Sequence, residues 1–356
     1  MKDLSTIHAP VLLEDCVNLV SPALEHKDSI IVDCTLGLAG HATAFLKAAP
    51  LATLVGIDRD SEALGLATKR MQDEGLNNRF IPVHAAFDEV DKVLEDLEID
   101  KIDAAFMDLG LSSLQIDEAD RGFSYSHNTA LDMRMDTTQS VTAATILATY
   151  SASSLAEIFR EYGQERFSGP IARKIVQVRQ ESPIVTSGQL VDLVDQVIPR
   201  AHRAPGNPAK RVFQALRIEV NGELDKLSRT LPKLALRLNN GGRIVVESYH
   251  SLEDITVKRF MNKGLEVDVP ANMPIVPQSA QPFFKSLTRG AIKASKEEIA
   301  NNTRSSSVRL RAVELIRDIP DRWIKDFTAI AQGEDTSLQH SSTKSNGVNR
   351  SKGGRF

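Results

Sequence analysis

Short apolar segments rich in β-branched residues alternate with helical patterns through the first third of the chain. Four segments are typical of strands, at residues 29–35 (SIIVDCT), 53–60 (TLVGIDRD), 79–87 (RFIPVHAAF) and 101–110 (KIDAAFMDLG). Helical patterns fill the intervals, and parallel neighbouring strands need such crossovers. The alternation therefore predicts an α/β fold with a doubly wound parallel sheet, which constrains the chain more than any other feature of its sequence.

The alternation stops near residue 112, and helical patterns dominate from there to about residue 213. In one of these patterns Thr186 and Gln189 predict a capping box at the start of a helix, and Pro199 predicts its end. The sequence therefore predicts an all-helical insert over residues 112–213, within a discontinuous α/β domain formed by residues 1–111 and 214–330.

Strand patterns return after the insert, at residues 241–251 (GGRIVVESYHS) and 307–315 (SVRLRAVEL). Ser251 and Asp254 are the expected cap residues of a helix that follows the first of these strands. The last stretch, residues 331–356, is polar and has no acidic residue from position 337 on. Because it has too little apolar surface to fold, it is expected to be a disordered basic tail.

The composition excludes several classes of protein. The chain has 356 residues, 42% of them hydrophobic, which is enough for two domains, and a formal net charge of −4. Binding to nucleic acid would therefore need local basic patches. The only cysteines, Cys16 and Cys34, suit neither a disulfide scaffold nor a zinc site, so no metal is expected. Without an apolar run of about 18 residues or a leader-like N-terminus, a cytoplasmic protein without membrane contact is expected.

The loop after the first predicted strand, DCTLGLAGHA (33–42), passes from strand to helix through Gly37 and Gly40. It lacks the GxxxxGK[ST] pattern of a phosphate loop, and its glycine spacing differs from the GxGxxG of a dinucleotide loop. A nucleoside such as S-adenosylmethionine needs only close backbone approach and an acid after the second strand for its ribose. Asp58 has that place, although an acid there also suits NAD. Alternatively, the glycines make only a tight turn.

The fourth predicted strand ends in MDLGLSS, which places Asp108 directly after an apolar run. Open α/β sheets bind their ligands at the carboxyl ends of the strands. Asp108 is therefore expected at the edge of a ligand pocket rather than in a solvated turn.

Several strings coincide, in order, with one family. They are HAPVLL (8–13), DCTLGLAGHA (33–42), GIDRD (56–60), DLGLSSLQID (108–117), RGFSY (121–125), LDMRMD (131–136), YGQERF (162–167), NPAKRVFQALRIEVN (207–221), GGRIVVESYHSLED (241–254) and RSSSVRLRA (304–312). The chain thereby resembles the bacterial 16S ribosomal RNA (cytosine-N4) methyltransferases. The resemblance implies a class I methyltransferase-like sheet with a helical insert. It also implies S-adenosylmethionine as cofactor and, as substrate, a decoding-region cytidine of 16S ribosomal RNA in the small ribosomal subunit. A homodimer remains open.

Taken residue by residue, the resemblance implies a set of cofactor contacts. They are Ala39, Gly40 and His41 in the loop, Asp58, Phe87 and Asp108 after the second, third and fourth strands, and Gln115 just beyond. The family usually has Gly-Gly-His where this chain has Ala39-Gly40-His41, and a histidine at Asn207. Because alanine with a positive φ costs about 1 kcal/mol or more, Ala39 is expected to have a negative φ.

The implied methyl acceptor, N4 of cytosine, is a poor nucleophile because its lone pair is delocalised into the ring. A group that accepts an N4 hydrogen would localise the lone pair and take the proton. Asp108, Asp132, Asp136 and His250 are the candidates for this catalytic role. Alternatively, LDMRMD is an ion-paired turn and His250 a structural residue at a helix start.

Basic residues without an intervening acid gather between positions 199 and 218. This pattern predicts phosphate contacts, although a run of charges is usually only a solvated face. The substrate-binding candidates are Arg134, Lys210, Arg211 and Arg217. Two rival functions are a non-catalytic ribosome assembly factor, which would have lost the cofactor residues, and a dehydrogenase, which would need GxGxxG.

Overall fold

Seven strands form one mixed sheet in the order β3-β2-β1-β4-β5-β7-β6. The computed structural model describes residues 10–110, 122–123, 128–203, 206–267, 277, 280–335 and 337–338. The strands are β1 (Ile30–Asp33), β2 (Thr53–Asp58), β3 (Phe80–His84), β4 (Ile102–Asp108), β5 (Leu238–Ser248), β6 (Phe284–Ser286) and β7 (Arg309–Leu315). Strands β1 to β5 are parallel to one another, whereas β7 is antiparallel to both β5 and β6.

This strand order confirms the predicted class I methyltransferase-like, doubly wound sheet. The order reverses between β1 and β4, and open α/β sheets bind ligands at such a switch point. Six of the seven strands match predicted segments. The sequence did not predict β6, because three residues at a sheet edge are too few to show an alternating pattern.

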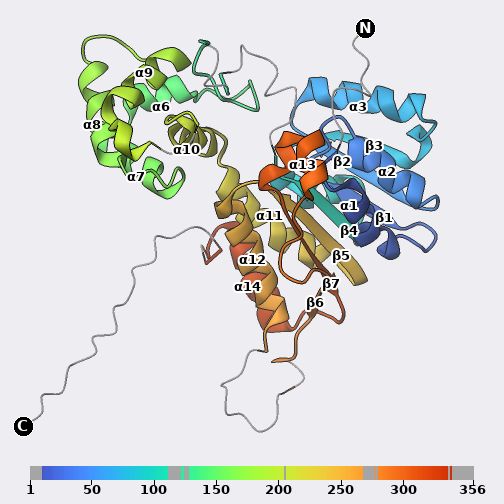
Figure 1. Cartoon of the computed structure of the whole chain (residues 1–356). Coiled ribbons are helices and arrows are strands. Elements are labelled where there is room, and N and C mark those ends of the chain that lie inside the picture. The colour runs from blue at the N-terminus through green and yellow to red at the C-terminus, as the bar shows by residue number, and fades with distance from the viewer. Residues whose placement is uncertain are drawn as a thin grey trace, which may run out of the picture.

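Helices cover both faces of the sheet (Figure 1). One face carries α1 (Leu13–Val20), α2 (Gly40–Ala48) and α3 (Ser61–Asp73); the other carries α4 (Val90–Asp96), α11 (Glu223–Arg237), α12 (Ser251–Leu265) and α14 (Asp321–Gln332). A short helix, α13 (Lys296–Asn301), precedes β7. In β4, Phe106 packs into the first of these two cores and Met107 into the second. Central strands are therefore apolar on both faces, which explains their unbroken hydrophobic runs.

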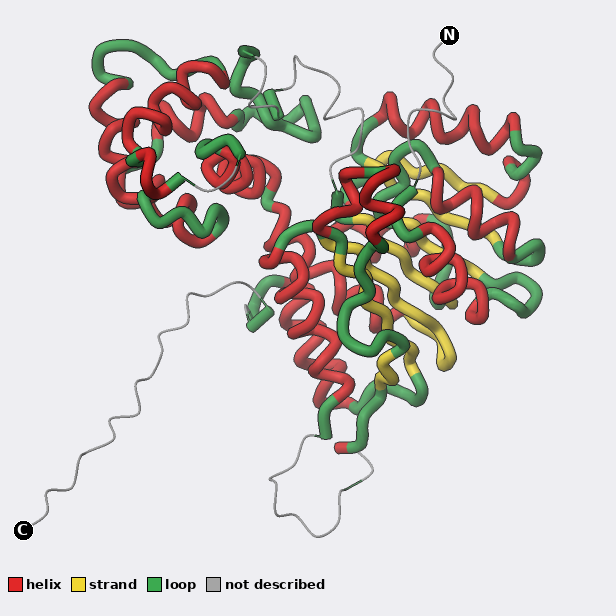
Figure 2. The backbone as a smooth tube through the Cα atoms, viewed as in Figure 1, coloured by secondary structure: helices red, strands yellow, loops and turns green. Residues whose placement is uncertain are grey.

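The helical insert has a hydrophobic core of its own, and Figure 2 shows its helices as a separate group beside the sheet. They are α6 (Ala143–Thr149), α7 (Ala152–Glu161), α8 (Ser168–Val178), α9 (Ser187–Val197) and α10 (Lys210–Asn221). The predicted capping box is confirmed, since the side chain of Thr186 accepts from Gln189 N–H at the start of α9. Helix α10 packs within this core and ends at Gly222, where φ is 60°. We therefore place the end of the insert at Gly222 rather than at residue 213.

The C-terminal part packs against the α11–α12 face of the sheet. Gly333 ends α14 with φ 78°, and Leu338 lies in the same core as Phe327 and Ile330 with only 1% of its surface exposed. The prediction that disorder begins at residue 331 is therefore wrong for this stretch, because one leucine reaches back to the core. Residues 339–356 lie outside the described part. No helix in the described ranges is long and apolar enough to span a membrane.

Candidate active site at the carboxyl edge of the sheet

Three carboxyl groups stand at the ends of adjacent strands. Asp33 ends β1, Asp58 ends β2 and Asp108 ends β4. Burial, together with the charges of Asp108 and Asp58, raises the pKa of Asp33 to about 8. Burial also raises the pKa of Asp58. Such a concentration of carboxyl groups suits a positively charged ligand. Asp33 is not among the predicted site residues, although it ends an apolar strand just as Asp108 does.

The loop after β1 is tied to the end of β2. The amide of Gly37 donates to Asp58 Oδ2 at 2.7 Å, and the amide of Asp60 donates to Asp58 Oδ1 at 2.8 Å. The backbone amide of Asp108 donates to Thr35 Oγ1 at 2.6 Å, which links the same loop to β4. Asp58, the predicted ribose ligand, therefore shapes the loop after β1.

Ala39 overturns one expectation. Its φ is 58° and its ψ 33°, the left-handed conformation that glycine adopts without strain, and its side chain is fully buried. The predicted negative φ is therefore wrong. An L-residue in this conformation costs about 1–2 kcal/mol, which the packing of the loop must offset. The position is held because Ala39 N–H donates to Leu36 C=O and Thr43 N–H donates to Ala39 C=O.

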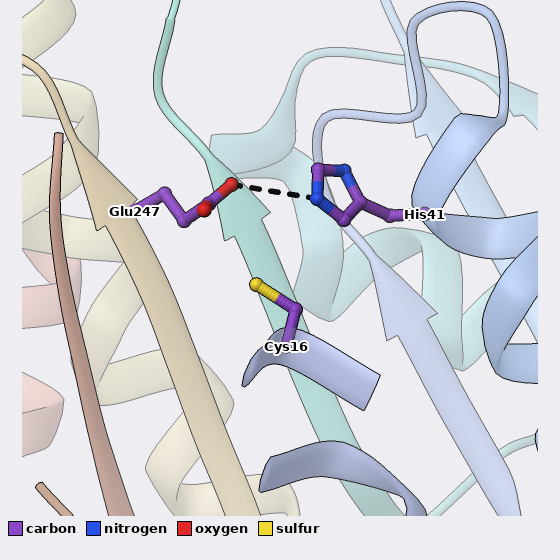
Figure 3. Close-up of side chains that lie close together, drawn as sticks. All are labelled: Cys16, His41 and Glu247. Atoms are coloured by element: carbon purple, nitrogen blue, oxygen red, sulfur yellow. Dashed lines mark ion pairs between the residues drawn. The ribbon is translucent and has the colours of Figure 1, made fainter. Parts of the chain in front are cut away.

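Gly40 and His41 begin α2, as the glycine pattern predicts. Both residues are constrained by close packing against neighbouring segments. A Cβ on Gly40 would lie 2.6 Å from Cγ of Pro10, so glycine is required by close contact with the segment before α1. The His41 ring is buried, and its Nε2 lies 2.9 Å from the carbonyl oxygen of Val11 and 3.6 Å from Glu247 Oε2 (Figure 3). The His41 side chain therefore contacts the core rather than standing free at the edge.

Asp108 lies beside an aromatic residue that sequence reasoning missed. A hydrogen bond joins the Tyr249 side chain to that of Asp108, and the Tyr249 ring lies against Gly110, where an added Cβ would be 3.0 Å from Cε2. Burial and the charges of Asp108 and Glu247 raise the pKa of Tyr249, so the phenol remains protonated and donates. Asp108 is therefore held in place at the edge. The sequence signal for Tyr249 is its place in the SYHSLED string, directly after the apolar run of β5.

The LDMRMD segment forms an ion-paired turn that also reaches the edge of the sheet. Asp132 accepts two bonds from Arg134, each of 2.7 Å, and Arg134 also donates to the Thr137 and Gln139 carbonyls. The turn interpretation is thus confirmed, and the predicted phosphate contact of Arg134 gains no support. Hydrogen bonds from Thr138 lower the pKa of Asp136.

Two residues join this turn to the rest of the protein. Asn221, at the end of α10, accepts from Met135 N–H at 2.9 Å and donates to the Met133 carbonyl at 2.8 Å. Arg59, directly after Asp58, donates to the sulfur of Met135. The insert therefore meets the α/β domain next to the predicted ribose site.

His250 caps a helix instead of facing a ligand. It is the N-cap of α12, where its Nδ1 accepts from Glu253 N–H, while Glu253 accepts in return from the amides of Tyr249 and His250. The predicted cap residues Ser251 and Asp254 are wrong, and Asp254 pairs with Arg311 of β7 at 2.7 Å. The structural interpretation of His250 is thus favoured over the catalytic one.

The basic residues of the insert divide into exposed and buried ones. Lys210 and Arg211 are exposed at the start of α10, and Arg211 donates to the Gln164 carbonyl at 3.2 Å. Arg217 instead forms a 2.8 Å ion pair with Glu223 across the junction of α10 and α11. Its predicted role in binding phosphate is not supported, because its guanidinium is committed to this buried pair.

Phe87 and Gln115 are the two remaining cofactor candidates. Phe87 starts a short 3₁₀ helix, Phe87–Glu89, after β3 and is half-buried at the same edge as Asp58. Gln115 lies outside the described residues. Six of the seven predicted cofactor residues therefore lie at the carboxyl ends of β2 and β4 or in the segments that follow β1 and β3: Ala39, Gly40, His41, Asp58, Phe87 and Asp108.

Comparisons with known proteins agree with this geometry. The model of the MraW methylase family matches residues 5–316. A protein of Bifidobacterium longum named ribosomal RNA small subunit methyltransferase H is 68% identical over 96% of this chain and 96% of its own. A protein of the same name from a Nocardioides species is 51% identical over 86% of this chain and 96% of its own.

Likeness to solved structures is weaker. An rRNA methylase from Streptococcus thermophilus aligns over 86% of this chain and 94% of its own, with 12% identity and a TM-score of 0.36. The strand order, rather than this likeness, identifies the fold. On the family model and the high identity to the two relatives, the chain belongs to the MraW methylase family.

Proposed function

We propose that the protein is an S-adenosylmethionine-dependent methyltransferase that methylates N4 of a decoding-region cytidine in 16S ribosomal RNA of the small subunit. Membership of the MraW methylase family and the relatives' name support the reaction class. The observation that carries the assignment is the group of carboxyls of Asp33, Asp58 and Asp108 at the switch point of the sheet. These suit a cofactor that carries a sulfonium and an ammonium group. We also expect the protein to act in the cytoplasm.

The residues at the edge divide the work of binding. When bound, S-adenosylmethionine supplies the methyl group. Asp58 is placed to accept from ribose hydroxyls, Phe87 to cover an adenine, and the Ala39–Gly40 backbone to approach the amino-acid end. Displacement at a methyl group depends mainly on alignment, and a rigid site that holds the reactants in line contributes several kcal/mol. The bonds of Asp58 to Gly37 and Asp60 supply that rigidity.

Asp108 is the best-supported of the four candidates for the group that accepts the N4 proton. Asp132 is paired twice with Arg134, Asp136 accepts from Thr138, and His250 caps α12. Asp108 stands at the sheet edge itself, oriented by the Tyr249 hydroxyl. A carboxylate there would accept an N4 hydrogen, make the lone pair available and take the proton as the new bond forms.

Substitution of Asp108 by asparagine separates its two predicted roles. If Asp108 accepts the proton, the substitution should lower kcat for methyl transfer about 100-fold or more. The affinity for the cofactor should then change less than about threefold. Calorimetry with S-adenosylmethionine and single-turnover methylation measure the two effects. A loss of affinity as large as the loss of kcat would instead make Asp108 a cofactor ligand.

The function as a whole is tested with labelled S-adenosylmethionine and small subunits that lack the modification. Label should enter the 16S ribosomal RNA at one cytidine, and nuclease mapping identifies the position. Binding of small subunits without transfer of label would favour the assembly-factor alternative. A dehydrogenase is disfavoured by the loop, which has only Gly37 and Gly40 where GxGxxG requires three glycines.

A further inference from the structure

Below the cofactor loop, three side chains that are common metal ligands converge in the core. Cys16 comes from α1, His41 from the start of α2 and Glu247 from the end of β5, and Figure 3 shows them facing one another. One ligand atom from each lies within 4.8 Å of the other two, and His41 Nε2 is 3.6 Å from Glu247 Oε2. The proposed methyl transfer uses none of these side chains.

The carboxyl group of Glu247 is the unusual member. Its residue is fully buried, and among the described residues its carboxyl oxygens have no close hydrogen-bond partner beyond a weak interaction with the Cys16 thiol. A buried carboxyl group without such partners costs several kcal/mol unless it is protonated or neutralised by a cation. Burial raises the pKa of both Glu247 and Cys16 and lowers that of His41, which favours the neutral form of each side chain.

The donor set matches one class of ion. Thiolate, imidazole and carboxylate together are ligands of zinc and similar divalent transition metals, whereas magnesium and calcium prefer oxygen alone. Ligand atoms about 2.1 Å from a tetrahedral ion are about 3.4 Å apart, close to the His41–Glu247 separation. Exchange of the thiol and carboxyl protons for one divalent cation leaves the net charge of the buried cluster unchanged.

We propose that Cys16, His41 and Glu247 form a binding site for a zinc-class divalent metal ion. The ion would join α1, α2 and β5 directly beneath Ala39 and Gly40, and so would brace the loop that approaches the cofactor. Binding would replace the present bond from His41 Nε2 to the Val11 carbonyl, which is 2.9 Å long. This site goes beyond the proposed methyl transfer and does not depend on it.

Cobalt(II) tests the site because a thiolate ligand gives it a charge-transfer absorption that oxygen and nitrogen ligands do not. The full chain, without a tag and freed of metal by a chelator, is titrated with cobalt in the absence of cofactor and RNA. We expect one ion per chain, with a thiolate band that zinc abolishes. Cys34→Ala is the matched control, because Cys34 is also a buried free cysteine but packs in the opposite core.

Cys16→Ala should remove the band while Cys34→Ala retains it, and Glu247→Gln should weaken cobalt binding at least tenfold. If Cys16→Ala fails to fold, the nearly isosteric Glu247→Gln variant still tests the site. Three results would overturn the site: no thiolate band in the wild type, a band that survives Cys16→Ala, or unchanged affinity in Glu247→Gln. A metal-free polar cluster predicts the first of these results.

Discussion

Asp33 shows how the burial of a single carboxyl group couples the stability of the protein to pH. Its folded-state pKa of about 8 lies far above the ordinary value of 3.8. Between these two pH values the folded chain keeps a proton that the unfolded chain has lost, so Asp33 makes stability fall as pH rises through this window. We infer that the carboxyl group is retained because it favours a cationic cofactor.

Asp33→Asn should separate these two effects. At pH 8 the cofactor-free variant should be more stable than the wild type by more than about 1 kcal/mol, and at pH 4 the difference should vanish. Cofactor affinity should fall, because a negative charge near the cation is lost. Denaturant unfolding at both pH values and calorimetry with S-adenosylmethionine measure these changes. A variant less stable than the wild type at pH 8 would mean that Asp33 is charged and paired in the folded state.

At the scale of elements, one buried amide holds the LDMRMD turn to the last helix of the insert. Asn221 is 2% exposed and its side chain bonds to the Met133 carbonyl, the Met135 amide and the Arg217 carbonyl. The LDMRMD turn is thereby fixed to the end of α10, one residue before Gly222. A local sequence pattern did not reveal this link, because its partners are more than 80 residues apart.

Asn221→Ala should lower the free energy of unfolding by about 2–3 kcal/mol, since it leaves buried polar groups unpaired. Methylation of small subunits should fall while cofactor affinity remains within about twofold. Asn301→Ala is the matched control, because Asn301 is exposed at the end of α13 and should change stability by less than about 0.5 kcal/mol. Equal effects of the two substitutions would remove the special role of Asn221.

At the scale of the whole molecule, the sequence predicts those features that are determined by residues close together in the chain. Strands β1 to β5 and the acids Asp58 and Asp108 were predictable because hydrophobic runs and the residues that end them are neighbours in the chain. The positive φ of Ala39 and the packing of Leu338 were not, because each depends on residues from other elements. The Glu247 carboxyl was hidden in the same way, since its burial depends on α1.

Leu338 should stabilise the molecule although it lies beyond the last helix. Leu338→Ala should cost about 2–4 kcal/mol of unfolding free energy, as expected for a fully buried leucine. A chain that ends at residue 332 should lose a similar amount, whereas one that ends at residue 338 should match the full chain. Thermal and denaturant unfolding measure the stability of the full chain, the Leu338→Ala variant and the two shortened chains. Equal stability of the two shortened chains would show that Leu338 contributes nothing.

The two bodies of the molecule should divide cofactor binding from RNA binding, and Lys210 with Arg211 tests that division. Both are exposed at the start of α10 in the insert. The double substitution to alanine should reduce methylation of small subunits and make RNA binding less dependent on salt, by about one unit of slope for each lost phosphate contact. Affinity for S-adenosylmethionine should not change.

The bond from Arg211 to the Gln164 carbonyl supplies the competing explanation, in which Arg211 braces α10 against the loop after α7. Bracing predicts a lower melting temperature, whereas phosphate contact predicts an unchanged one. Lys210→Ala alone is the control, because the structure gives Lys210 no such bond within the described residues, and it should lower the salt slope by about one. Melting temperature, cofactor affinity and methyl transfer across a salt series are measured on one preparation. If cofactor affinity falls together with activity, the insert and the sheet do not divide the two tasks, because a change on the insert would then reach the carboxyl edge.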